Sequence, residues 1–74
     1  MEEDRKETIG KKALFFKEKS LPVHIILSNN KFYNGSINYI GADFLLIQDL
    51  LFGEMPAFFM EIVDIIPYRE KSTK

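Results

Sequence analysis

Apolar residues occur along most of the chain in short runs that are bounded by polar residues, a pattern typical of β-strands. The turns between the runs contain Asn, Gly, Ser and Asp, which favour chain reversal. Five strands are predicted, at 23–27, 31–40, 43–49, 55–60 and 62–67. Because the connections are short, consecutive strands are expected to pair as an antiparallel meander.

The longest predicted strand, 31–40, contains one glycine, Gly35. An interior glycine weakens a strand, so it usually marks a bulge, a tight bend or a close approach of another backbone. The alternation also changes phase after this glycine, because Tyr39 and Ile40 are both apolar. We expect the strand to bend sharply at Gly35 and to curl the sheet into a small barrel.

A period of three to four residues precedes the strands and predicts a helix at about 4–18. Its apolar stripe consists of Ile9, Ala13 and Phe16. Helical spacing places these three side chains on one face, which is expected to pack on the sheet.

Leu14 and Phe15 are expected to widen this stripe. Asp4, with Glu7 three residues later, fits a capping box and is the predicted N-cap. Pro22 is expected to follow the end of the helix, because proline cannot continue it.

The segment 49–54 is unusually apolar for an exposed turn, which predicts that something packs on Leu51 and Phe52. The next strand contains Pro56, which lacks a backbone donor and therefore belongs at a strand start or on an edge of the sheet. Only Glu61 separates this strand from the last one, so the chain must turn a corner there.

The chain has 74 residues and is expected to form one domain, 1–74, with a barrel at about 22–68 and a polar tail at 69–74. A domain of this size buries only about 60% of its unfolded surface. It has no cysteine for a disulfide, yet 46% of its residues are hydrophobic and 14% are aromatic. We therefore expect some apolar surface to face another chain.

The formal net charge is −1, which provides no overall attraction to nucleic acid or to an anionic membrane. No apolar run approaches the roughly 18–20 residues of a membrane span. The first residues are acidic where a signal peptide would be basic. These features predict no membrane partner and a cytoplasmic location.

Few residue patterns in the chain favour catalysis. His24 is the only histidine and lies in the middle of a predicted strand, where a structural role is expected. No glycine-rich phosphate loop or nucleophile elbow occurs, and the scattered carboxylates suit solvated turns and edges. We predict no enzymatic activity, no catalytic residues, no metal site and no cofactor.

Binding is better supported than catalysis. Aromatic residues of the central strand are interleaved with lysine and asparagine, an arrangement that can contact single-stranded RNA. The same rings can instead pack in the core and across strands, and the basic helix face can be merely solvated. The candidate RNA-binding residues are Lys31, Tyr33, Asn38, Tyr39, Asp43, Lys11 and Lys12.

The fourth predicted strand is aromatic and uncharged, so an exposed edge there would favour aggregation. Pairing with the fifth strand of a neighbouring copy would cover it, and repeated head-to-tail pairing closes a ring. The same edge can instead bind a different protein by strand addition. The expected interface residues between copies are Pro56, Phe58, Phe59, Met60, Ile62 and Ile65.

A short N-terminal helix followed by five strands resembles the Sm, LSm and Hfq family. The correspondence covers about 11–68 and includes the apolar strand 23–27, Gly35 and a last strand closed by Pro67. It implies an Sm-like, SH3-type barrel with an N-terminal helix. It also implies a non-enzymatic RNA-binding or RNA-processing scaffold that forms a homo-oligomeric ring, hexameric or heptameric.

The chain departs from this family at the usual uridine-binding positions. The family's Asp, stacking aromatic and Asn fall at Gly41, Asp43 and Leu45; a shift of one or two residues would place Asp43 on the family's Asp but still gives no Asn. The family's Arg-Gly or Lys-His falls in the apolar segment 58–60. An alternative is therefore a protein-interaction or structural module that has the Sm fold but has lost the uridine pocket and does not bind RNA. A third possibility is an unrelated SH3-like barrel.

Overall fold

The computed structural model describes residues 2–69 of the chain, with side chains from residue 6 onward. The helix α1 (Glu2–Glu18) precedes five strands, β1 (Val23–Leu27), β2 (Phe32–Ile40), β3 (Phe44–Asp49), β4 (Gly53–Phe58) and β5 (Ile62–Pro67). A short 3-10 helix, η1 (Phe59–Glu61), forms the corner between β4 and β5. Most of the expected polar tail, 70–74, lies outside the described residues.

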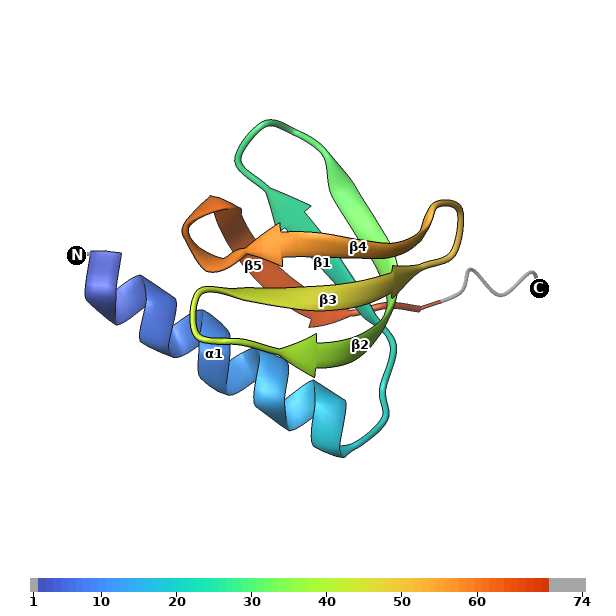
Figure 1. The fold of residues 1–74 in the computed structure, drawn as a ribbon, viewed down its shortest axis with the longest axis horizontal. Coiled ribbons are helices and arrows are strands. Elements are labelled where there is room, and N and C mark those ends of the chain that lie inside the picture. Colours follow the sequence, from blue (N-terminus) through green and yellow to red (C-terminus); the bar gives the residue numbers. More distant parts are fainter. Residues whose placement is uncertain (1, 70–74) are drawn as a thin grey trace.

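All five strands form one antiparallel sheet in the order β4-β3-β2-β1-β5 (Figure 1). This confirms the predicted helix followed by a five-stranded antiparallel sheet. Pro56 lies in β4, which is an edge strand as expected. The two edge strands, β4 and β5, form no ladder with each other within residues 2–69, so the expected closure of the sheet into a barrel is not seen.

Gly35 is the point where β2 comes closest to β3. A Cβ atom at this position would lie 1.8 Å from the carbonyl oxygen of Gln48, so only glycine permits the contact. The irregularity in the β2–β3 ladder lies further along, between Ile37 and Tyr39. Gly35 therefore marks a close backbone approach, and the separate irregularity explains the change of phase seen in the sequence.

The helix α1 lies against the curved sheet, where it contacts β2, β5 and η1 (Figure 1). The predicted stripe is confirmed, because Ile9, Ala13 and Phe16 are buried. The prediction that Leu14 and Phe15 widen it is wrong, since these side chains are 49% and 52% exposed. Successive helical residues are rotated by about 100°, which turns these two away from the sheet.

The predicted N-cap is also wrong, because α1 begins at Glu2 and Asp4 lies inside it. At the other end, Ser20 adopts a positive φ of 56°. The N–H of Ser20 donates to the carbonyl of Lys17 and that of Leu21 to the carbonyl of Phe16, at 3.1 and 3.0 Å. These two hydrogen bonds form a Schellman motif in which serine occupies the usual glycine position.

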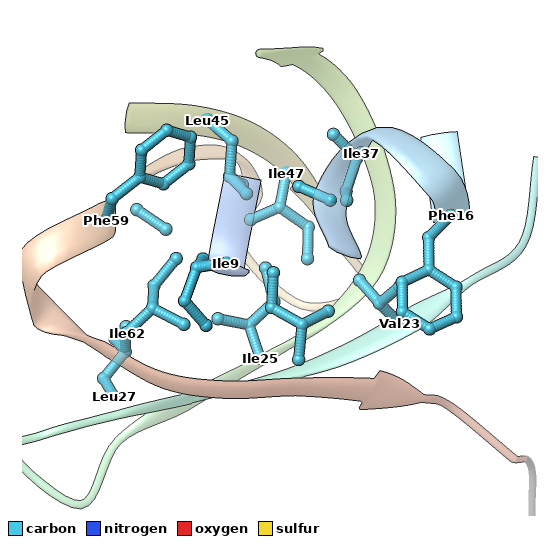
Figure 2. Close-up of a cluster of buried hydrophobic side chains, with 13 residues drawn as sticks. Ile9, Phe16, Val23, Ile25, Leu27, Ile37, Leu45, Ile47, Phe59 and Ile62 are labelled. Carbon is cyan, nitrogen blue, oxygen red and sulfur yellow. The ribbon is translucent and has the colours of Figure 1, made fainter. Parts of the chain in front are cut away.

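The core lies between the helix and the concave face of the sheet. Figure 2 shows Ile9 and Phe16 pointing into the same cluster as the strand side chains. The buried apolar residues are Ile9, Ala13, Phe16, Val23, Ile25, Leu27, Ile37, Leu45, Ile47, Ala57, Phe59, Ile62 and Ile65. The strand order and the position of the helix are consistent with an Sm-like fold. No helix among residues 2–69 is long and apolar enough to span a membrane.

Candidate functional site

The β1–β2 turn and the β3–β4 loop border an open hollow of about 500 Å³ at one end of the sheet. One wall is the segment 30–34, and the other is formed by the segment 49–52 together with Met55. The two walls are brought together by the β2–β3 register, in which Gly35 pairs with Asp49. The close approach that Gly35 permits therefore also places the hollow.

Asp49 is a buried carboxylate that holds the β3–β4 loop in shape. Its Oδ1 accepts a hydrogen bond from the N–H of Asn34, and its Oδ2 accepts from the N–H groups of Leu51 and Phe52, all at 2.9 Å. Burial raises the pKa of Asp49, but the three donors outweigh it and keep the pKa below its ordinary value. The carboxylate is therefore charged at neutral pH and links both walls.

The backbone of the loop makes a further hydrogen bond across the hollow. The N–H of Leu50 donates to the carbonyl of Asn34 at 2.8 Å. Together with the two bonds to Asp49, this satisfies the N–H groups of Leu50, Leu51 and Phe52. The loop is therefore fixed, although its side chains are among the most exposed apolar groups of the molecule.

The opposite wall begins at a tight turn. Asn30 adopts a positive φ of 69°, as expected of an asparagine in this turn. The N–H of Lys31 donates to Oδ1 of Asn29 at 3.0 Å, and its carbonyl accepts from the N–H of Leu27 at 2.9 Å. Lys31 is exposed, so its ammonium group adds a positive charge beside the hollow.

Aromatic rings line the hollow from both walls. Phe32 is 56% exposed and Phe52 is 70% exposed, whereas Tyr33 is half-buried and packs on the core. His24 packs on the ring of Phe32, with centroids 5.2 Å apart, and its Nδ1 is hydrogen-bonded to Oδ1 of Asn34. His24 therefore positions two residues of the wall.

The hollow offers flat apolar faces with a lysine and asparagines beside them. Such a site suits a planar ring that stacks on aromatic side chains and carries a nearby negative charge. An unpaired nucleobase with its phosphate has this chemistry.

Two of the predicted RNA-binding residues, Lys31 and Tyr33, meet at this hollow. The helix residues do not, because their ammonium groups pair elsewhere. Lys11 Nζ lies 3.9 Å from the carboxylate of Glu7, and Lys12 Nζ lies 2.6 Å from Asp64. The Lys12 contact outweighs the opposing effect of burial and lowers the pKa of Asp64.

The other predicted residues lie on the sheet away from the hollow. Asn38 donates to Gln48 and to Glu54, at 3.1 and 3.2 Å. The ring of Tyr39 packs on Phe44, with centroids 6.1 Å apart.

The β2–β3 turn contacts the corner between β4 and β5. Asp43, in the β2–β3 turn, lies 2.6 Å from Lys6 Nζ. Its carbonyl accepts from the N–H of Phe59 at 2.9 Å, and the Phe59 ring is buried in the core. This region therefore presents an ion pair and a backbone contact, and the hollow lies elsewhere.

The sequence did not predict that the β3–β4 loop forms one wall of the hollow. The lining residues that were not predicted are Asn30, Asp49, Leu50 and Met55. The one signal of this wall in the sequence was the apolar turn at 49–54. The expected packing on Leu51 and Phe52 is absent among the described residues, since they are 85% and 70% exposed.

The residues predicted at the interface between copies divide into two groups. Pro56, Phe58 and Met60 have exposed side chains. The side chains of Phe59, Ile62 and Ile65 are buried in the core of the same chain, so they are not available for contact with a neighbour.

Comparison with known proteins adds no family assignment. No family model matches the chain, and no curated protein is significantly similar to it. The functional interpretation therefore depends on the topology and on the hollow.

Proposed function

We propose that this chain is a non-enzymatic, Sm-like RNA-binding scaffold that takes unpaired bases of single-stranded RNA into the hollow. The observation that carries the proposal is the meeting of Phe32, Tyr33 and Phe52 with Lys31 around one recess. Aromatic faces stack bases with little sequence preference, and a lysine beside them can neutralise a phosphate.

One hollow supplies limited affinity, because stacking contributes about 1–3 kcal/mol per base. An assembly would repeat the hollow in every copy and raise the effective concentration of each further contact with a long strand. We therefore propose that the scaffold acts as an oligomer.

The open edges β4 and β5 support such an assembly. Among residues 2–69, each has a strand partner on one side only, β3 for β4 and β1 for β5. Antiparallel pairing of β4 with β5 of the next copy would complete both edges and continue the sheet from copy to copy. Because the two edges differ, this pairing is head-to-tail and can close a homo-oligomeric ring.

Fluorescence anisotropy with a labelled single-stranded RNA at low salt tests RNA binding. Phe32→Ala is the decisive variant, since its half-exposed ring can be removed without opening the core. Loss of one stacking contact of about 1–3 kcal/mol predicts affinity weakened by roughly 5- to 150-fold. Lys31→Ala should instead lower the salt dependence of binding by about one counterion.

Tyr39→Ala is the matched control, because Tyr39 is 53% exposed but lies away from the hollow. It should bind RNA like the unmodified chain. A loss confined to Tyr39→Ala would place RNA on the Tyr39–Phe44 surface and contradict the proposed site. No binding of the unmodified chain at low salt would contradict the RNA function itself.

The second candidate is a protein-interaction or structural module that does not bind RNA. The exposed apolar loop between β3 and β4 and the two open edges favour it. Such a module would bind another protein by strand addition at β4 or β5. Specific strand pairing without RNA binding would support this function.

A further inference from the structure

The most exposed apolar cluster of the described residues belongs to the hollow itself. It consists of Leu50, Leu51 and Phe52 in the β3–β4 loop and of Phe32 across the hollow, and we call it the hairpin tip. These side chains are 67%, 85%, 70% and 56% exposed. A patch of contiguous large apolar groups on so small a domain marks a surface that another molecule covers.

The backbone of the hairpin tip can be buried at little cost. Unpaired backbone donors make burial costly, but the N–H groups of Leu50, Leu51 and Phe52 already donate to Asn34 and Asp49. The carboxylate of Asp49, which binds the loop backbone, is itself buried and hydrogen-bonded. Covering the tip therefore removes apolar surface from water and leaves none of these polar groups without a hydrogen-bond partner.

The same face carries both a projection and a recess. Leu51 projects most, and the hollow of about 500 Å³ lies beside it. A surface with both features can fit a second copy of itself, as a two-fold interface between identical copies requires. The occupant that fits this shape is a second copy of the chain.

The area and the rim charges agree with that occupant. If docking covered all four side chains completely, it would bury roughly 500 Å² per copy and about 1,000 Å² in total, which is the lower bound of a specific interface. Lys31 and Glu54 are exposed on the two segments flanking the tip. In a two-fold arrangement, opposite rim charges of this kind can face one another.

We propose that two copies dock face to face through their hairpin tips, with Leu51 of each copy seated in the hollow of the other. This docking is separate from strand pairing at β4 and β5. It also regulates the proposed RNA site, because a docked tip and a base compete for one hollow. The competition with RNA rests on the proposed function, whereas the docking itself does not.

Sedimentation velocity of the full chain over a series of concentrations tests the docking without RNA. The unmodified chain should double the mass of its basic assembly as concentration rises. Leu51→Ser should shift the midpoint of this step at least tenfold toward higher concentration. Because Leu51 is 85% exposed, the variant should keep the fold, which circular dichroism checks.

Leu21→Ser is the matched control, since Leu21 is also exposed but lies after the helix, outside the hairpin tip. It should leave the midpoint unchanged. Docking is overturned if no doubling occurs, or if Leu51→Ser and Leu21→Ser behave alike.

Addition of single-stranded RNA then tests the competition. Saturating RNA should return the doubled species to the basic assembly. RNA that binds without changing the mass would overturn the competition. If RNA does not bind while Leu51→Ser still prevents doubling, the proposed function fails and the docking stands.

Discussion

Asp49 is the residue that does most to shape the candidate site. Its carboxylate accepts hydrogen bonds from three backbone N–H groups, those of Asn34, Leu51 and Phe52. An uncharged side chain with one acceptor oxygen cannot take all three bonds equally well. The loop conformation therefore depends on the ionised form of Asp49.

We predict that Asp49→Asn lowers the free energy of unfolding by about 1–3 kcal/mol at pH 7, because buried N–H groups lose their partner. The pKa of Asp49 is lower in the folded chain than its ordinary value. Its stabilisation is thus complete above the unfolded pKa of about 4 and is lost as pH falls through the lower folded pKa. Urea unfolding measures both effects.

The pH series supplies the control for this prediction. Asp64 also has a lowered pKa, so both proteins should lose stability in acid. The unmodified chain should lose more of it below about pH 4 than Asp49→Asn does. Equal stability of the two proteins at pH 7 would show that Asp49 does not hold the loop.

At the scale of elements, the contact between β2 and β3 decides where the site lies. A Cβ atom added at Gly35 would lie 1.8 Å from the backbone carbonyl oxygen of Gln48. This backbone atom cannot move aside as a flexible side chain would. Gly10 in α1 is different, since a Cβ there would meet only the Phe59 ring at 4.0 Å. Substitution of Gly10 by alanine is therefore a control for the same substitution at Gly35.

We predict that Gly35→Ala lowers the free energy of unfolding by roughly 3 kcal/mol or more, in the upper range for point variants. Gly10→Ala should raise it by about 0.5–1 kcal/mol, because alanine restricts the unfolded chain and favours the helix. Thermal and urea unfolding should show these opposite signs. A mild effect of Gly35→Ala would mean that the sheet can open at this point.

Local periodicity was sufficient to predict most elements. The spacing of Ile9, Ala13 and Phe16 identified the face of α1 that packs on the sheet, and Pro56 identified an edge strand. Leu14 and Phe15 were misplaced because helical spacing shows where a buried stripe runs but not how wide it is. Its width depends on how closely the helix sits on the sheet, which is a tertiary property.

The hollow was only half predictable for a similar reason. Lys31 and Tyr33 stood out as part of an aromatic and basic segment. Asp49 and the β3–β4 loop face them only through the register that pairs Gly35 with Asp49. A shift of one residue in that register would turn the wall outward, and no local pattern in the sequence fixes it.

At the scale of the whole molecule, the apolar side chains that stay exposed gather on surfaces that other chains can cover. One group of exposed side chains forms the hairpin tip, and another lies along β4, η1 and β5, at Phe58, Met60, Val63 and Ile66. The first suits docking of two faces and the second suits pairing of strand edges. The two surfaces can therefore be tested independently.

Edge pairing between copies requires a probe that is not part of the core. Phe59 belongs to the aromatic segment predicted for the interface, but its side chain is 4% exposed and packs in the core. Phe59→Asp would therefore unfold the domain before it reported on assembly. Val63 is better placed, since it lies on the edge strand β5 and is 45% exposed.

We predict that Val63→Glu breaks the edge-paired assembly, because a charge on an edge strand disfavours pairing with another strand. Val63→Thr keeps the β-branched shape and should stay assembled. Light scattering after size exclusion measures the mass, and combining Val63→Glu with Leu51→Ser separates the two surfaces. If edge pairing builds the assembly, Val63→Glu alone should leave at most tip-docked pairs, and the double variant should be monomeric. An unchanged mass for Val63→Glu would mean that β4 and β5 do not join neighbouring copies.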